Sequence, residues 1–170
     1  VLANVSADQL DQPTPCKDWN LSALIDHLVG AQLWACSAME GQKMEDTGEG
    51  SAQGDFQAAF DAAAARTLAA FQADGALGKT VNPGFGDMPA PALLGLATTD
   101  TFTHAWDVAK ATGQDTNLAP ELAAALLAQS QQSIQPGFRS EQGSIFGFEQ
   151  EAPEGASPAD QLAALPSRTV

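Results

Sequence analysis

The stretch NLSALIDHLVGAQLWACSAMEG, residues 20–41, decides the fold. Its larger apolar residues recur at the spacing of one helix face: Leu21, Leu24, Ile25, Leu28, Ala31 and Trp34. Asn20 is a suitable N-cap, and Gly41 is a typical helix end because glycine adopts left-handed backbone angles without strain. The pattern predicts a long helix from Asn20 to about Glu40 with one face turned toward a core.

The rest of the chain is also helical in pattern. Further helices are predicted over residues 55–73, 89–112, 119–133 and, in short form, 158–165. Residues 1–12 are typical of the tail of a helix, residues 41–54 of a solvated loop, and residues 79–81 of a short extended piece. Composition agrees, since 33 alanines and 17 leucines stand against nine valines and isoleucines. The predicted class is all-α.

A length of 170 residues suits one domain with its own core. Within it we expect a helical, metal-binding bundle over residues 1–135 and an irregular C-terminal arm over residues 136–170. The arm is rich in Gly, Pro, Ser and Glu, and we expect it to pack on the bundle through Ile145, Phe146 and Phe148.

The charge balance narrows the partners. Seven Lys and Arg against 21 Asp and Glu give a net charge of −14. Such a surface repels phosphate backbones and anionic lipid, so nucleic-acid and membrane partners are not expected. No apolar run approaches the roughly 20 residues that cross a bilayer. The residues from Val1 onward lack the basic and apolar regions of a secretory signal, so none is expected in the sequence given. Cys16 and Cys36 form no disulfide framework, so we expect reduced thiols in a cytoplasmic protein.

The chain's two histidines both lie on apolar helix faces. Asp100 and His104 are four residues apart and therefore stand one above the other, with Asp107 on the same stripe. A carboxylate and an imidazole in this arrangement can bind one metal ion, and a third ligand from a facing helix would complete the site. The same spacing also fits packed core histidines and an ordinary i,i+4 pair, so both interpretations stay open.

Cys16 has two interpretations as well. It follows a proline-rich turn and precedes Lys17, which would lower the pKa of the thiol if the two side chains were close. It is a candidate fourth ligand or reactive thiol, or else a small buried residue at a tight turn. Cys36 and the three tryptophans, Trp19, Trp34 and Trp106, are expected to pack in the core.

Three stretches carry a family resemblance. PTPCKDWN (residues 13–20) leading into LIDHLVG (24–30), and Asp100 to Gly113 read as D-x-x-x-H-x-W-D-x-A-x-A-T-G, resemble the mycothiol-dependent maleylpyruvate isomerase N-terminal domain. This is a family of the actinobacterial, DinB-like metal-binding superfamily. A weaker match is APEGASPADQLAAL (152–165), followed by Ser167 and Arg168.

The resemblance implies an up-down-down-up four-helix bundle with long connections that holds a divalent metal. It assigns His27, Asp100 and His104 as ligands of zinc, or of nickel, iron or manganese, with mycothiol as co-substrate. Asp100 stands where the isomerase has glutamate. Asp107 is either a partner that orients a ligand histidine or a cap near Trp106.

The resemblance also implies that Val1 enters the family's first helix midway. A truncated first helix would expose apolar surface unless a partner chain, as in a homodimer, or residues upstream of Val1 cover it. Since the isomerase's C-terminal domain has no counterpart here, the same substrate is not implied.

Three functions follow as hypotheses. The first is a metal-dependent transferase or isomerase that activates mycothiol for attack on a small electrophile. The second is a non-catalytic bundle that senses metal or thiol. The third is a helical domain whose histidines are merely packed. Catalytic and cofactor-contacting residues beyond the metal ligands are not assigned.

Overall fold

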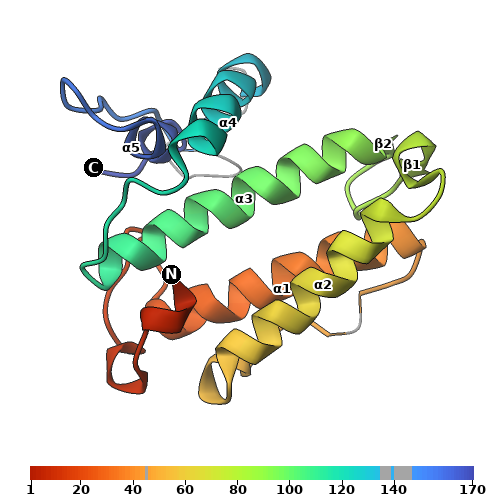
Figure 1. The fold of residues 1–170 in the computed structure, drawn as a ribbon, viewed down its shortest axis with the longest axis horizontal. Helices are drawn as coiled ribbons and strands as arrows, with labels where there is room; N and C mark the ends of the chain where they lie inside the picture. Colours follow the sequence, from red (N-terminus) through yellow and green to blue (C-terminus); the bar gives the residue numbers. More distant parts are fainter. Residues whose placement is uncertain (45, 135–138, 140–146) are drawn as a thin grey trace.

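The computed structural model describes residues 1–44, 46–134, 139 and 147–170, and this part of the chain is mostly helical (Figure 1). The helices are α1 (Leu21–Glu40), α2 (Phe56–Gln72), α3 (Ala90–Ala111), α4 (Pro120–Ser133) and α5 (Pro158–Ala164). Two short strands, β1 (Thr80–Val81) and β2 (Met88–Pro89), pair antiparallel before α3. The all-α class is confirmed. Each helix predicted between residues 20 and 165 is present, and its observed ends differ from the predicted ends by a residue or two at most.

Local chemistry sets the ends of α1. The side chain of Asn20 accepts a hydrogen bond from the backbone N–H of Ala23 at 3.0 Å, which satisfies one of the free donors at the helix start. Gly41 ends the helix with a φ of 67°, in the left-handed region that glycine tolerates best. Both ends are therefore as the sequence predicts.

Helix α1 is the central element, because it packs against both α2 and α3. The helices α1 and α3 run antiparallel (Figure 1), and their apolar faces form two clusters along the shared interface. One cluster joins Leu24 and Ile25 of α1 to Val108 of α3. The other joins Ala35 to Leu93 and lies toward the β-hairpin. This long interface positions the residues of the candidate site.

A third cluster joins α3 to the C-terminal helices. Trp106 is fully buried there among small and branched side chains of α4 and α5, and its indole N–H donates to Asp160 at 2.8 Å. The predicted packing through aromatic residues of the arm is wrong for Phe148, which is largely exposed. Ile145 and Phe146 lie outside the described residues. The contacts come from α5 instead, whose apolar face includes Leu162.

The predicted helix tail over residues 1–12 is wrong. Two 3-10 turns, Leu2–Asn4 and Ala7–Gln9, occupy this segment. The side chain of Gln9 accepts a hydrogen bond from the backbone N–H of Ser6 at 3.0 Å and closes the second turn locally. Leu2, Val5 and Leu10 still pack against the cluster around Ile25.

The predicted loop over 41–54 is anchored to α1. The carboxylate of Asp26 accepts from the backbone N–H groups of Gly50 and Ala52, at 3.0 and 2.7 Å. Gly48 meets Gly30 so closely that a Cβ on either residue would collide with backbone atoms. This segment is therefore held against the helix that carries His27. Among the described residues, no helix is both long and apolar enough to span a bilayer.

Candidate metal centre

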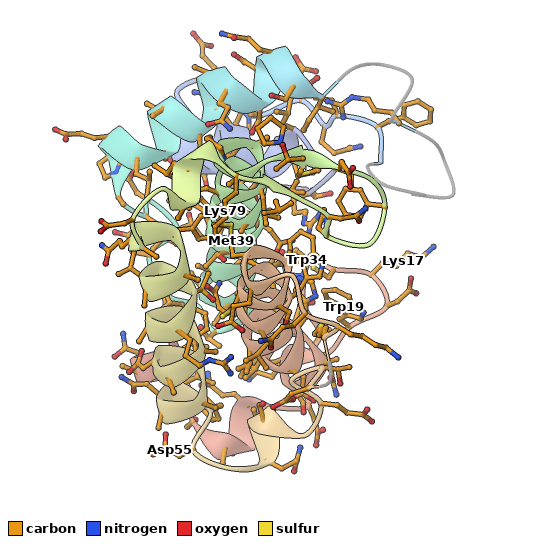
Figure 2. The ribbon with its side chains drawn as sticks, turned by 90° about the vertical axis from the view of Figure 1, so that its right-hand side faces the viewer. Lys17, Trp19, Trp34, Met39, Asp55 and Lys79 are labelled. Carbon is orange, nitrogen blue, oxygen red and sulfur yellow. The ribbon has the colours of Figure 1, made fainter. Side chains whose placement is uncertain are left out.

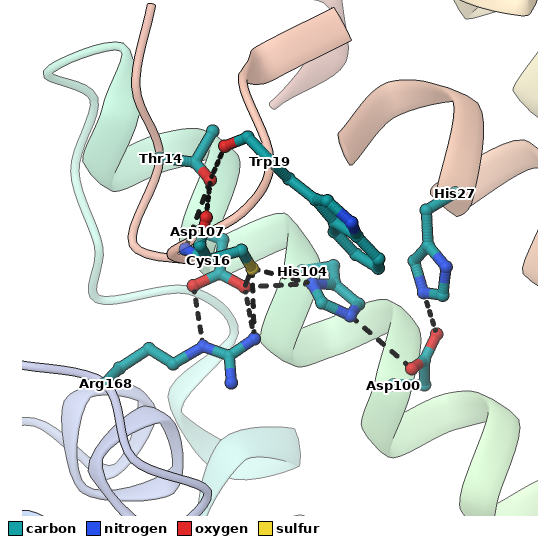
Figure 3. A network of polar contacts seen from close by, with 8 residues as sticks. All are labelled: Thr14, Cys16, Trp19, His27, Asp100, His104, Asp107 and Arg168. Carbon is teal, nitrogen blue, oxygen red and sulfur yellow. Dashed lines mark hydrogen bonds and ion pairs between the residues drawn. The ribbon is translucent and has the colours of Figure 1, made fainter. Parts of the chain in front are cut away.

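The structure brings together the three residues that the resemblance predicts as ligands (Figure 3). Nε2 of His27 lies 3.2 Å from Oδ2 of Asp100, and Nε2 of His104 lies 3.6 Å from Oδ1 of the same carboxylate. Asp100 thus stands between two imidazole nitrogens, one from each helix. Their role as metal ligands stays a prediction.

The pairing of α1 with α3 explains why these residues meet. Asp100 and His104 are one turn apart on α3, and His27 projects from α1 toward them (Figure 3). One turn further along α1, the side-chain amide of Gln32 donates to the hydroxyl of Thr101 at 2.7 Å. This partly buried hydrogen bond helps to fix the register of the two helices beside the site.

The donor set fits a divalent cation. Two imidazole nitrogens and one carboxylate oxygen lie within 4.8 Å of one another, the separation expected of atoms that share one ion. The side chains of His27 and Asp100 are 31% and 32% exposed, whereas His104 is buried. Three protein donors with one side open to solvent match the composition of catalytic rather than structural zinc sites.

Asp107 contacts the other nitrogen of His104. Its Oδ2 lies 2.9 Å from Nδ1 of the ring, and the carboxylate has no solvent exposure. An ionised carboxylate only accepts hydrogen bonds, so the proton of this contact belongs to Nδ1. In the neutral ring, Nε2 then keeps its lone pair and faces Asp100. No hydrogen bond supports the alternative that Asp107 caps Trp106, because the indole N–H of Trp106 donates to Asp160 instead.

Arg168 completes the network from the C-terminal segment. Its guanidinium donates to both oxygens of Asp107, through Nε at 3.1 Å and Nη2 at 2.9 Å. Burial alone would raise the pKa of Asp107, but the hydrogen bonds from His104 and Arg168 outweigh it and lower that pKa below its ordinary value. Asp107 is therefore a buried carboxylate held ionised by two donors.

Cys16 lies in the same network, next to Arg168. Its thiol donates to Asp107 at 3.1 Å and accepts from Nη2 of Arg168 at 3.2 Å. Burial and the charge of Asp107 raise the pKa of Cys16 to about 12. Lys17 is not among the groups that set this pKa, and the raised pKa argues against a reactive thiol at Cys16. Cys16 and Cys36 are both free thiols, as predicted.

The indole of Trp19 packs beside the rings of both histidines. Its ring centroid lies 4.7 Å from that of His27 and 5.6 Å from that of His104. The turn that carries it is closed by Thr14, whose hydroxyl donates to the carbonyl of Trp19 at 2.7 Å. The indole shields one side of the imidazole pair from water, so Trp19 is part of the site and not only of the core.

A second group of metal-type donors lies behind the first. It consists of Cys16, His104 and Asp107, and it shares His104 with the first group through the opposite ring nitrogen. The guanidinium of Arg168 already supplies a positive charge to two of these residues. The group of His27, Asp100 and His104 is therefore the better candidate for a metal ion.

Sequence reasoning assigned no role to Arg168. The residue is 61 positions from Asp107, and no local spacing connects the two. The available signal was the Ser167-Arg168 pair within the weakest of the three family-like stretches. The small number of cationic residues was a further signal, because the whole chain has only seven Lys and Arg.

Comparison with known proteins identifies the family of the chain. A sequence model described as the mycothiol maleylpyruvate isomerase N-terminal domain matches residues 1–109. The chain belongs to this family. The matched span contains His27, Asp100, His104 and Asp107, while Arg168 lies beyond it.

Two relatives extend over the whole chain. Both come from Mycobacterium tuberculosis and are named as uncharacterized proteins: MT0763 of strain CDC 1551 / Oshkosh and Rv0738 of strain ATCC 25618 / H37Rv. Each is 43% identical over 174 residues, which cover 100% of this chain and 91% of the relative. The match to these relatives therefore includes the C-terminal segment with Arg168, which lies outside the residues that the family model matches. No solved structure matches the chain.

Proposed function

We propose that this protein is a cytoplasmic, metal-dependent transferase or isomerase that uses mycothiol to attack a small electrophile. The observation that carries the proposal is the convergence of His27, Asp100 and His104, with Asp107 on the far nitrogen of His104. Membership of the family named for a mycothiol-dependent isomerase supports the choice of thiol. We also propose that the helices form the up-down-down-up four-helix bundle that the resemblance to this family implies.

The proposed metal is zinc, with nickel, iron or manganese as alternatives that the same donors accept. A divalent cation at this position lowers the pKa of a thiol bound to it, which makes the thiolate available near neutral pH. Asp100 is one methylene shorter than the glutamate of the isomerase, so its carboxylate lies closer to the backbone of α3. The contact with His27 at 3.2 Å indicates that the shorter side chain still reaches the site.

The surrounding residues have defined tasks in this scheme. Asp107 holds His104 with Nε2 toward Asp100, and Arg168 keeps Asp107 ionised by donating to both of its oxygens. Trp19 excludes water from one side of the imidazole pair. The remaining open side, where His27 and Asp100 are exposed, is where thiol and electrophile would enter.

The test combines metal loading with turnover. Metal-loaded protein is incubated with mycothiol and an alkylating electrophile, and the conjugate is measured by mass spectrometry against His27→Ala protein. The proposal expects faster conjugation with wild-type protein and loss of the acceleration in the variant. Metal binding without any acceleration would instead favour the sensor hypothesis, and absence of metal binding would favour packed histidines.

A further inference from the structure

Phe85 is a large aromatic side chain in an unusual place. It lies in the turn between β1 and β2 and is 66% exposed, in a chain with only 11 aromatic residues. Its ring stacks on Trp34, with centroids 6.2 Å apart and planes inclined by 23°. Neither the core clusters nor the candidate metal centre explains why an aromatic ring is held in solvent here.

The turn that carries Phe85 is preformed. The indole N–H of Trp34 donates to the carbonyl of Pro83 at 2.8 Å, which ties the turn to α1. Asn82 accepts from the backbone N–H of Gly84 at 2.9 Å and donates to Asp87 at 2.8 Å, which closes the turn from within. An exposed ring fixed in this way loses little freedom when a ligand packs on it.

The aromatic pair continues the surface of the candidate metal centre. Trp34 follows His27 by seven residues and so lies on the same face of α1, about 10 Å along the helix. Leu96 precedes Asp100 by four residues, lies about 6 Å along α3, and is 38% exposed. Because α1 and α3 are antiparallel, both steps lead in one direction. Figure 2 shows Trp19 and Trp34 on the same side of the molecule.

We infer that Trp34, Phe85 and Leu96, called here the aromatic face, bind an aromatic or similarly apolar group of the electrophile. The inference rests on the proposed function, since the reacting atom would lie at His27, Asp100 and His104. A span of about 10 Å accommodates a molecule of one or two rings. The expected substrates are therefore electrophiles that carry an aromatic or similarly apolar group.

A small ligand is the occupant that the geometry supports, because Trp34 and Leu96 lie one to two turns from the centre on the same helix faces and the turn of Phe85 is closed by hydrogen bonds. Binding is tested without any reaction by titrating 1-naphthol, a neutral two-ring probe, into the full chain in a calorimeter. Phe85→Ala should weaken binding and raise the dissociation constant by about threefold to tenfold. Leu68→Ala removes a comparably exposed side chain from α2, 56% exposed, and should leave the constant unchanged.

A turnover experiment separates this inference from the proposed function. Metal-loaded protein conjugates mycothiol to monobromobimane, an aromatic electrophile, or to iodoacetamide, a small polar one. In each reaction the thiol sulfur bonds to the carbon that bears the halogen, the halide leaves with the bonding electrons, and the thiol proton passes to solvent. Phe85→Ala should raise KM about threefold to tenfold for the bimane only.

The outcomes are distinct. If naphthol binding depends on Phe85 but no conjugate forms, the aromatic face stands and the proposed function fails. If conjugation occurs and Phe85→Ala changes neither KM nor naphthol binding, the proposed function stands and the aromatic face is overturned. If wild-type protein does not bind naphthol and instead forms a dimer that Phe85→Ala dissociates in sedimentation velocity, the face is a subunit interface and the inference is overturned.

Discussion

Oδ2 of Asp107 lies 2.9 Å from Nδ1 of His104, and this contact turns the opposite nitrogen of the ring toward Asp100. Nε2 of His104 and the carboxylate of Asp100 then face each other at 3.6 Å. Such an arrangement is stabilised by a cation between them. A buried carboxylate three residues along the helix thus determines what the exposed end of the site can bind.

Replacing Asp107 by Asn should weaken metal binding. The amide preserves the shape of the side chain but no longer offers His104 an ionised acceptor, so the ring loses its preferred orientation and basicity. Loss of such a partner typically costs about 10- to 100-fold in metal affinity. Competition with a coloured chelator measures the change, and Asp61→Asn on the surface of α2 controls for the loss of one negative charge. Equal affinities in all three proteins would contradict the role of Asp107.

Arg168→Met should be strongly destabilising. It leaves the buried carboxylate of Asp107 without its cationic partner, which typically costs about 3–5 kcal/mol in the free energy of unfolding. Arg66→Met is the matched control, because its pair with Glu40 at 3.5 Å is largely exposed and should contribute less than about 1 kcal/mol. Urea unfolding followed by circular dichroism measures both values, and a similar loss in the two variants would contradict this account.

Asp160 should make stability depend on pH. Burial alone raises its pKa, but hydrogen bonds from Trp106 and Ser157 outweigh this and lower the pKa below the ordinary value of 3.8. A carboxylate with a lowered pKa in the folded state stabilises the fold above the unfolded pKa and loses this contribution as pH falls toward the folded one. Asp160→Asn should therefore cost about 1 kcal/mol at pH 7.

The difference between wild type and Asp160→Asn should shrink as pH falls below about 3.8. Urea unfolding followed by circular dichroism at a series of pH values measures it. A difference that stays constant down to low pH would mean that the charge of Asp160 does not contribute.

Gly30→Ala should destabilise the protein although alanine is the better helix former. A Cβ at Gly30 would lie 2.3 Å from the carbonyl oxygen of Thr47, and backbone cannot move aside as a side chain does. The expected cost is about 1–3 kcal/mol. In Gly95→Ala, by contrast, the nearest atoms belong to the flexible side chain of Gln129, so the gain in helix propensity should make this variant neutral or more stable. Thermal unfolding compares the two, and the opposite order would refute the tight loop contact.

Local signals in the sequence were enough to predict the helices and to place Asp100 and His104 on one helix face. Asn20 and Gly41 act within a few residues of α1, and the spacing of Asp100 and His104 is a property of one helix. Residues 1–12 were mispredicted because the apolar spacing of Leu2, Val5 and Leu10 resembles a helix. The segment instead folds as separate turns whose polar side chains bind the local backbone.

The rest of the site depends on contacts between distant segments. Arg168 reaches Asp107 only because α5 packs on α3 and the chain then returns toward Cys16. The raised pKa of Cys16 follows from that burial, whereas the sequence showed only its neighbour Lys17. Phe85 stacks on Trp34 across a hairpin turn, and no periodicity along the chain connects these two residues.

The central claim is that His27, Asp100 and His104 hold a divalent metal ion, and elemental analysis of the purified, untreated protein tests it most directly. We predict about one zinc or similar ion per chain. The ion should be lost in His104→Ala and in the more exposed His27→Ala, with the helical circular dichroism of His27→Ala retained. Wild-type protein that contains no metal and takes up none at micromolar concentrations would contradict the claim.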